Sequence, residues 1–321
     1  MLKGLRRLGA VSAAAVLMSS TALAQYPDKP ITMIVGFTAG GATDILARAI
    51  APLMEKSLDA KIVVVNRTGA GGELAFNAIA AAEPDGYTIG LINSPNVLTI
   101  PIERKANYSI DKFDLLGNVI DDPGAFTVHA ESRWKTLKDL IAEAKARPGQ
   151  ITVGTTGVGS DDHVAMLELE RQVGVRFNHI PFKGGADVRA ALIGKQIDVA
   201  SMNIGEGVQG TTTGAPFHNL AQMATERSHV APDVPTFKEL GYDVVVAALR
   251  GIAAPKGLPQ DVRAKLVESL AAAVNDAAFR ERAERMFNPV RYLDPEAYQM
   301  ELRAGDAHYR ALWKEMPWTE K

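Results

Sequence analysis

The chain alternates between short runs of β-branched residues and longer segments whose apolar residues recur every three or four positions. Ile31–Val35 is a continuous apolar run, and Ile45, Leu46, Ala49 and Ile50 follow it at helical spacing. Because strands and helices alternate, the pattern favours an α/β fold in which mainly parallel sheets are flanked by helices. The same two patterns predict strands at 31–35, 62–65, 87–92, 151–154, 175–180 and 197–202, and helices at 43–58, 73–82, 137–146, 161–173, 186–193, 261–275, 277–286 and 295–313.

Two places depart from this alternation and predict crossings between lobes. Residues 115–120 and 125–128 look like two extended pieces around Asp121-Asp122-Pro123-Gly124, and a strand at 244–249 leads into Gly251. Two strand crossovers between two α/β units predict a hinged, two-lobed molecule. We assign residues 25–123 and 251–321 to lobe 1 and residues 124–250 to lobe 2.

The first 24 residues have the pattern of an export signal. Lys3, Arg6 and Arg7 precede an apolar stretch over 8–18, and Ala22-Leu23-Ala24 forms a small-x-small cleavage site. The apolar stretch is short for a membrane span. The pattern therefore predicts a cleaved signal peptide over 1–24 and a mature chain that begins at Gln25.

Composition excludes several functional classes. Without its first 24 residues the chain carries 32 Lys and Arg against 37 Asp and Glu, a formal net charge of −5, which argues against a nucleic-acid surface. There is no cysteine, so thiol catalysis and thiolate metal sites are excluded. The six histidines form neither H-E-x-x-H nor another metal spacing. We expect no metal, no cofactor and no catalytic residue.

Glycine and hydroxyl residues gather in three loops, each after a predicted strand and before a predicted helix. The loops are 37–44 (FTAGGATD), 69–72 (GAGG) and 154–160 (GTTGVGS). Ligands of open α/β sheets lie at this edge, and the free N–H groups and positive dipole end of a helix start favour an anion. Any one loop also fits a tight turn that caps a helix, whereas three at one edge favour a shared site.

The kind of anion follows from what the loops lack. None has Lys followed by Ser or Thr in the P-loop arrangement, and Gly154, Gly157 and Gly159 do not give G-x-G-x-x-G. A site built from main-chain N–H groups and hydroxyls, with few fixed cations, suits a carboxylate. The sequence leaves the identity of the acid open.

A hydrolase or isomerase that uses Ser160 and His163 is the alternative from a different class. Ser160 does not lie in a G-x-S-x-G elbow, and His163 follows it by three residues at a predicted helix start. This spacing favours helix capping over a nucleophile–base pair. Asp44 likewise suits a first-turn helix acid better than a ligand contact.

Several short motifs occur in an order that is specific as a set, and they cover essentially the whole chain after residue 24. In this order they resemble the tripartite tricarboxylate transporter substrate-binding family, also called Bug receptors. The motifs are Tyr26-Pro27-x-x-Pro30-Ile31, Phe37-Thr38-Ala39-Gly40-Gly41-x-x-Asp44, Val64-Val65-Asn66-Arg67-x-Gly69-Ala70-Gly71-Gly72, Pro84-Asp85-Gly86-Tyr87-Thr88, Gly157-x-Gly159-Ser160-x-x-His163, Pro181-Phe182-Lys183-Gly184-Gly185, Ala231-Pro232-Asp233-Val234-Pro235-Thr236 and Ala254-Pro255-Lys256-Gly257.

The resemblance implies a two-lobed periplasmic binding protein fold of type II, with two hinge crossovers. It also implies a monomeric, periplasmic protein that captures an organic acid such as a dicarboxylate, tricarboxylate, aromatic acid or acidic amino acid. The implied partner is a membrane permease with one large and one small subunit. A receptor read by a sensor kinase is the alternative, because both roles need a surface formed on closure.

The resemblance also implies the residues of the ligand cleft. In the family the first loop and the Gly-Ser-x-x-His region hold a carboxylate, largely through main-chain N–H groups. Three further candidates come from topology, because they stand at the ends of predicted strands. The candidate binding residues are Phe37, Thr38, Ala39, Gly40 and Gly41 in lobe 1, Thr155, Thr156, Ser160 and His163 in lobe 2, and the strand-end residues Asn93, Ser94 and Asn203.

The chain departs from the family pattern at three informative places. Thr38 stands where Pro is common and adds a hydroxyl to the first loop, and Phe182 replaces a common Tyr. Arg250 precedes Gly251 where Trp is frequent. For Arg250 a structural salt bridge is favoured over a contact with a second carboxylate, because Arg so often pairs within the protein.

Overall fold

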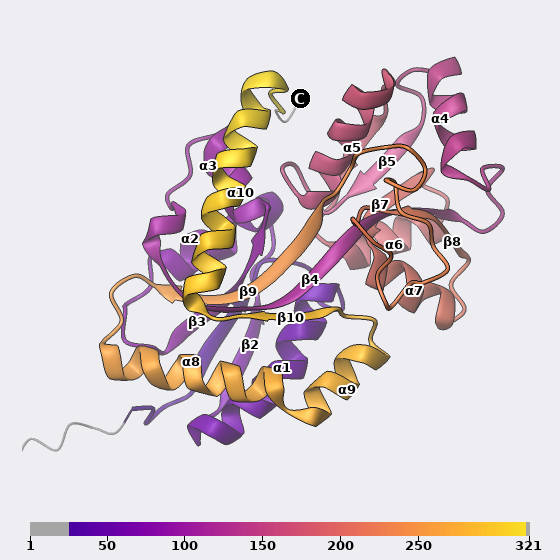
Figure 1. Ribbon diagram of the computed structural model, residues 1–321. Helices are drawn as coiled ribbons and strands as arrows, with labels where there is room; N and C mark the ends of the chain where they lie inside the picture. Colours follow the sequence, from indigo (N-terminus) through magenta and orange to yellow (C-terminus); the bar gives the residue numbers. More distant parts are fainter. Residues whose placement is uncertain (1–25, 319–321) are drawn as a thin grey trace, which may run out of the picture.

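The computed structural model describes residues 26–318, which form two lobes joined by long strands (Figure 1). The predicted signal peptide and its cleavage site lie outside the described residues. No helix within 26–318 combines the length and apolar character needed to cross a membrane.

The first lobe begins with three parallel strands in the order β2-β1-β3. These are β1 (Ile31–Val35), β2 (Ile62–Asn66) and β3 (Thr88–Ser94). Helices α1 (Ala42–Leu58), α2 (Glu73–Ala80) and α3 (Asn96–Glu103) follow the strands in turn, and single 3-10 turns stand at Ala70–Gly72 and Ile110–Lys112. Buried side chains of β1 and α1, such as Met33 and Ile50, fill the core between sheet and helix.

Two strands continue from one lobe into the other. Strand β4 (Phe113–His129) pairs antiparallel with β9 (Ala247–Pro255) up to Pro123, and from Gly124 onward it pairs with strands of the second lobe. The two extended pieces expected around Asp121–Gly124 are therefore one strand of 17 residues. Strand β9 also pairs antiparallel with β3 through Leu249 and Arg250, so the strand predicted at 244–249 begins and ends later.

The second lobe repeats the strand–helix alternation around a second sheet. Its parallel strands are β5 (Thr152–Thr155), β6 (Asn178–Pro181) and β7 (Val199–Asn203), and β8 (Phe217–Gln222) pairs with β4. Its own core surrounds Phe126 and Leu169. The helices are α4 (Leu137–Ala146), α5 (Asp161–Val173), α6 (Gly185–Ile193) and α7 (Ile204–Thr212).

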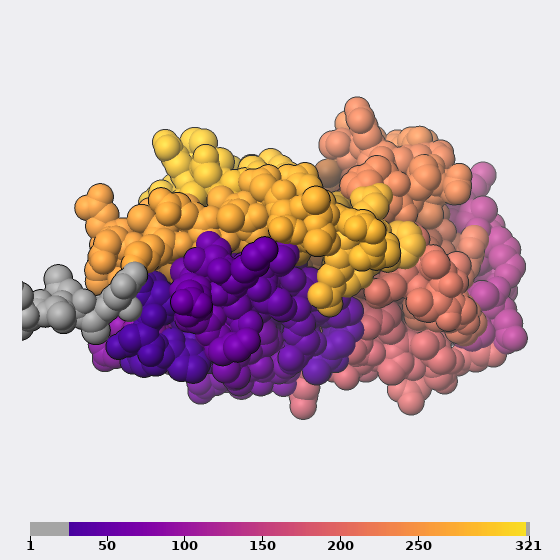
Figure 2. Space-filling view, turned by 90° about the horizontal axis from the view of Figure 1, so that it is seen from below, coloured from indigo at the N-terminus to yellow at the C-terminus, as the bar shows by residue number. Residues whose placement is uncertain are grey.

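After β9 the chain returns to the first lobe. Helices α8 (Gln260–Asn275) and α9 (Ala277–Arg285) lead to the short strand β10 (Val290–Leu293), which pairs with β4. The long helix α10 (Pro295–Glu315) lies beside α3, and Figure 2 shows the gold α9 segment against the second lobe.

The predicted α/β class and the two-lobed periplasmic binding protein fold are confirmed. The predicted parallel pairing holds for β1, β2 and β3 and for β5, β6 and β7, while the joining strands β4 and β9 pair antiparallel, so the sheet is mixed. The sequence did not predict α3, α7, β8 or β10. Helix α3 contains Pro101 and α7 contains three glycines, so neither has a clear helical pattern, and β10 is only four residues long.

Candidate binding site

A small cavity lies between the two lobes. Its volume is about 20 Å³, which is enough for about one water molecule. The lobes are therefore closed upon each other here. The lining residues are Phe37, Gly41, Ala42, Thr43, Asn93, Asn96, Ala248 and Arg250 from the first lobe and joining strand, and Thr156, Asp161, Gly185, Asn203 and Glu206 from the second lobe.

The start of α1 forms one wall of the cavity. Its N-cap residue is Gly41, and no side chain among the described residues caps this helix, so its first N–H groups face the cavity edge. Asp44 holds the preceding loop by accepting hydrogen bonds from Gly40 N (2.9 Å), Asn66 Nδ2 (2.9 Å) and Arg48 Nε (3.0 Å). Burial raises the pKa of Asp44, but these hydrogen bonds outweigh it and bring the pKa below its ordinary value. Asp44 therefore lies in the first turn of α1, as expected, and it orders the loop that precedes this helix.

The start of α6 faces α1 from the opposite lobe. Its N-cap residue Gly184 likewise receives no side-chain cap within the described chain. A Cβ placed on Gly41 would lie 3.7 Å from the main-chain nitrogens of both Gly185 and Ala186. Two uncapped helix starts from different lobes thus meet at one point, where their N–H groups and dipoles together favour an anion.

The start of α5 is different because its own side chain caps it. Ser160 Oγ accepts the hydrogen bond from His163 N at 3.2 Å, and His163 Nδ1 accepts one from Gly159 N at 3.1 Å. The hydroxyl and the imidazole therefore serve the main chain and do not form a nucleophile–base pair. This arrangement argues against the hydrolase alternative.

His163 belongs to a buried pair of stacked imidazoles. Its ring lies 4.0 Å from that of His179 at an angle of 7°, and His179 Nε2 lies 2.6 Å from Thr155 Oγ1. Burial lowers the pKa of His163 well below its ordinary value, and His179 adds to the effect. Burial also lowers the pKa of His179 to about 4. Both rings are consequently neutral at pH 7 and supply no cation to the cleft.

Arg250 and its neighbours form a buried network on the floor of the cavity. Arg250 donates to Asp122 Oδ2 at 2.9 Å and to Asn203 Oδ1 at 2.6 Å, and Asn203 donates to Asp161 Oδ2 at 2.7 Å. Burial raises the pKa of Asp122 to about 6, although the charge of Arg250 acts against the rise. Arg250 thus makes the structural salt bridge that the sequence favoured, and it also lines the cavity.

Glu206 is one of several cavity residues, with Thr43, Asn96, Asp161 and Gly185, that sequence reasoning missed. It stands on α7, is 5% exposed, and forms an ion pair with Arg189 of α6. Arg189 also donates to Gly40 O at 2.7 Å across the lobe boundary. Glu206 lies three residues after Asn203, where a strand was predicted to end. Asn203 was chosen because residues at strand ends face the ligand edge of a sheet. The same reason would have pointed to Glu206 if the sequence had predicted α7.

The structure brings some of the predicted residues to the cavity and not others. Phe37, Gly41, Asn93, Thr156 and Asn203 line it. Thr38, Ala39 and Gly40 lie in the loop beside it without lining it. Thr155, Ser160 and His163 are buried behind the cavity wall, and Ser94 lines a separate surface cavity together with residues such as Asp121, Met223 and His308.

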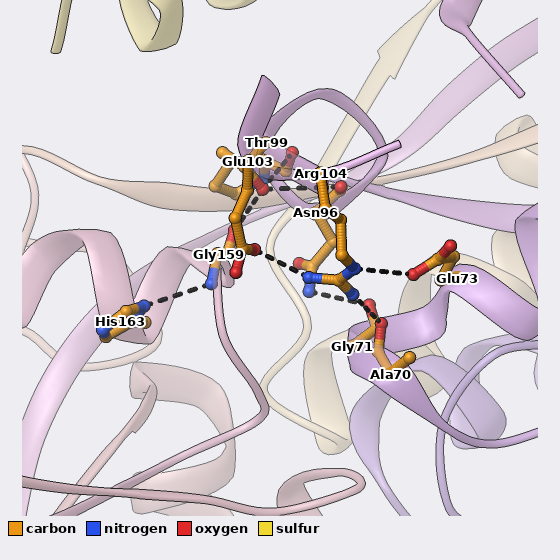
Figure 3. A network of polar contacts seen from close by, with 10 residues as sticks. Ala70, Gly71, Glu73, Asn96, Thr99, Glu103, Arg104, Gly159 and His163 are labelled. Carbon is orange, nitrogen blue, oxygen red and sulfur yellow. Dashed lines mark hydrogen bonds and ion pairs between the residues drawn. The ribbon is translucent and has the colours of Figure 1, made fainter. Parts of the chain in front are cut away.

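The second and third glycine-rich loops meet each other outside the cavity. A Cβ on Gly157 would lie 3.1 Å from Gly71 Cα, so the two main chains touch. Thr99 Oγ1 of α3 donates to Gly159 O of the opposite lobe, and Asn96 Nδ2 donates to Gly71 O at 2.9 Å (Figure 3). Arg104 fixes the start of the 69–72 loop by donating to Ala70 O at 3.1 Å and Glu73 Oε2 at 2.9 Å. These loops therefore contribute lobe contacts.

This architecture defines a class of protein: a two-lobed solute-binding protein whose cleft presents helix starts to an anion. The chain belongs to the tripartite tricarboxylate transporter family receptors, whose family model matches residues 46–302. The resemblance found in the sequence is thereby confirmed.

Relatives and solved structures agree with this assignment. The chain is 33% identical over 301 residues to the "UPF0065 protein in gbd 5'region" of Cupriavidus necator, covering 91% of this chain and 89% of that one. The periplasmic binding protein BugD is 32% identical with a TM-score of 0.85, covering 90% of this chain and 98% of BugD. MatC from Rhodopseudomonas palustris, solved with bound malate, is 27% identical with a TM-score of 0.84, covering 89% of this chain and 99% of MatC. The family is a family of receptors and BugD is a periplasmic binding protein, so both are binding proteins.

Proposed function

We propose that this protein captures a small organic carboxylate in the periplasm and delivers it to a membrane permease with one large and one small subunit. The chain acts as a monomer, and residues 1–24 direct its export before cleavage ahead of Gln25. Lobe 1 (residues 25–123 and 251–321) and lobe 2 (residues 124–250) close over the ligand by bending β4 and β9.

The observation that carries the proposal is the meeting of two uncapped helix starts from opposite lobes. The N–H groups at the starts of α1 and α6 converge between Gly41 and Gly185. A carboxylate there would satisfy donors from both lobes at once and so stabilise the closed form. A structural neighbour with the same fold, MatC, was solved with bound malate, a dicarboxylate.

The predicted residues take two roles in this proposal. Phe37, Gly41, Asn93, Thr156 and Asn203 contact the ligand, because they line the cavity. Thr38, Ala39, Gly40, Thr155, Ser160 and His163 shape the loops behind these contacts, and Ser94 ends β3 beside Asn93. The closed cavity of about 20 Å³ is too small for a dicarboxylate, so with the ligand bound the lobes stand further apart at the cavity than they do here.

A thermal-shift panel tests the proposal directly. The panel contains C4–C8 dicarboxylates, citrate and aromatic acids, and each acid is compared with its neutral amide. We expect at least one acid to raise the melting temperature, with a stabilisation of about 2.7 kcal/mol at one hundred times its dissociation constant. The matching amide should give no shift, because it carries no charge for the helix starts. A folded protein that no acid stabilises would contradict the proposal.

A further inference from the structure

The start of α6 already faces one of the protein's own carboxylates. Glu206 of α7 lies against Gly185, because a Cβ added to this glycine would stand 2.7 Å from Glu206 Oε2 and 2.8 Å from Glu206 Cδ. The same carboxylate pairs with Arg189, four residues further along α6. Glu206 is 5% exposed and lines the cavity between the lobes. It therefore stands where the first N–H groups and the positive dipole end of α6 favour an anion.

The charge of Glu206 is unfavourable for the other acids of the cleft. Burial raises the pKa values of three nearby carboxyl groups, and the charge of Glu206 adds to each rise. The three groups are those of Asp122, Asp161 and Asp162. A ligand carboxylate beside Glu206 would meet the same repulsion, which a dry cleft screens only weakly. Glu206 and a ligand carboxylate therefore exclude each other at the start of α6.

Two further polar atoms show that Glu206 does not complete the site. Arg250 Nε and Asn93 Oδ1 are buried and have no hydrogen-bond partner among the described residues, and both residues line the cavity. Asn93 of β3 pairs with Arg250 of β9 in the sheet, so the two side chains are neighbours. A buried polar atom without a partner costs about 1 to 3 kcal/mol. These atoms point to a bound molecule that extends from the start of α6 to the floor of the cavity.

We propose, building on the carboxylate-binding function above, that Glu206 holds the place of the ligand's carboxylate at the start of α6 while no ligand is bound. When an acid binds, its carboxylate takes over the contacts with Arg189 and with Gly185, and the side chain of Glu206 moves aside. One carboxylate thus replaces another beside the same guanidinium group. The rest of the acid supplies an acceptor to Arg250 Nε.

This exchange makes Glu206 a determinant of ligand selectivity. A small monocarboxylate such as acetate offers nothing that Glu206 does not already provide, and Glu206 has the advantage of being attached to the protein. A larger acid that also reaches Arg250 Nε and the start of α1 gains contacts that Glu206 does not make. Glu206 therefore excludes small acids and lowers the affinity for larger ones.

Isothermal titration calorimetry measures the effect of Glu206 on affinity. The titrant is the acid that gives the largest stabilisation in the thermal-shift panel, which is run on the parent and on Glu206→Gln. This variant keeps the size of the side chain and removes its charge, so we expect it to bind the acid at least tenfold tighter than the parent. Glu143→Gln is the matched control, because Glu143 also pairs with arginines of lobe 2, Arg133 and Arg147, but does not line the cavity. The control should keep the affinity of the parent.

Acetate tests whether the two carboxylates share one place. Glu206→Ala removes the carboxylate and leaves room at the start of α6. Acetate should raise the melting temperature of this variant and leave that of the parent unchanged, while neutral acetamide should affect neither. Saturating acetate should also weaken the binding of the larger acid to Glu206→Ala at least fivefold, because both need the same contacts.

The outcomes separate this proposal from the function on which it rests. If Glu206→Gln binds the acid no tighter than the parent does, Glu206 is only a structural partner of Arg189 and the proposal is overturned. If acetate and the larger acid bind Glu206→Ala independently, they occupy different places and the proposal is overturned as well; this second test also decides the matter if Glu206→Gln folds poorly. If no acid of the panel binds the parent or either variant, the carboxylate-binding function itself fails.

Discussion

At the scale of single residues, burial decides which charged groups are available to a ligand. The sequence favoured a structural salt bridge for Arg250 over a ligand contact, and its two NH groups bond Asp122 and Asn203. The spacing of Ser160 and His163 favoured helix capping over a reactive pair, and each bonds the main chain at the start of α5. The partners of these groups come from segments distant in sequence, so spacing along the chain does not reveal them.

The stacked histidines give a prediction about pH at this scale. The pKa of His179 is about 4 in the folded protein and 6.5 as an ordinary value, so the unfolded chain binds more protons between these limits. The protein therefore has its full stability with respect to His179 above pH 6.5. It loses that part of its free energy of unfolding as the pH falls from 6.5 toward 4. The loss is at most about 3 kcal/mol, at about 1.36 kcal/mol for each pKa unit.

Urea unfolding at several pH values between 7 and 4 measures this effect. His179→Gln keeps a partner for Thr155, and His179→Phe keeps the ring stack, so together they separate titration from packing. Both variants should lose less stability than the parent on acidification. Acidification changes the contribution of Asp122 to stability in the opposite direction, because its pKa is raised to about 6. Asp122 is present in all three proteins, so this effect is common to them. Parallel curves for parent and variants would rule the effect out.

At the scale of elements, the helices around the cleft differ in how they begin. Helix α5 is capped by Ser160, while α1 and α6 begin at Gly41 and Gly184 without a side-chain cap from the described residues. Side-chain caps normally satisfy the first N–H groups of a helix. Leaving two such starts uncapped costs stability and places their N–H groups where the lobes meet, with the carboxylate of Glu206 lying against Gly185 at the start of α6.

The contact between the starts of α1 and α6 predicts the effect of Gly41→Val. Gly41 has φ −79°, which valine tolerates, and its added Cβ would lie 3.2 Å from Thr38 O of the same loop and 3.7 Å from the main-chain nitrogens of Gly185 and Ala186 of the other lobe. We expect ligand affinity to fall at least tenfold, with little change in the melting temperature of the ligand-free protein. Calorimetry with the acid that binds the parent measures this.

Gly194→Val is the matched control for that change. Gly194 has φ −76°, is exposed, and its added Cβ would lie 3.3 Å from the main-chain oxygen of Ala190, a neighbour in the same lobe. The control should bind like the parent. Equal affinity of Gly41→Val and Gly194→Val would show that the starts of α1 and α6 do not approach each other in the bound form.

At the scale of the whole molecule, contacts across the cleft set the balance between open and closed forms. Thr99 Oγ1 donates to Gly159 O, Arg189 donates to Gly40 O, and Trp318 packs with Val158 and Val164 of the second lobe. A ligand that binds only the closed form loses affinity in proportion to the fraction of molecules that are open. Residues far from the ligand therefore affect its affinity.

Thr99→Val tests this coupling with an almost isosteric change. The variant leaves Gly159 O without its partner in the closed form only, at a cost of about 1 to 3 kcal/mol, so ligand affinity should fall about fivefold or more. Thr211→Val is the control, because Thr211 Oγ1 donates to Gly207 O at 2.9 Å within α7 and crosses no lobe boundary. Small-angle scattering of the ligand-free variant should show a larger radius of gyration than the parent. Unchanged affinity and radius would refute the coupling.

Much of the fold was determined by the sequence, because local patterns report local structure. The apolar periods located β1, α1, α4 and α5, and the glycine-rich loops identified the edge where the lobes meet. The motif order was also enough to indicate the family. Helices α3 and α7 escaped prediction because tertiary packing stabilises them despite Pro101 and the glycines of α7.

Only the tertiary structure decided which groups face the cleft. Glu206, Asp161 and Arg250 come from three different elements, and their pairing depends on how α7, α5 and β9 pack. The sequence located the glycine-rich loop at the start of α1, because glycines and hydroxyls after a strand form a local pattern, but it did not single out the start of α6. It did not supply the balance of buried acids and cations, because electrostatic interactions depend on distances between segments that only folding brings together.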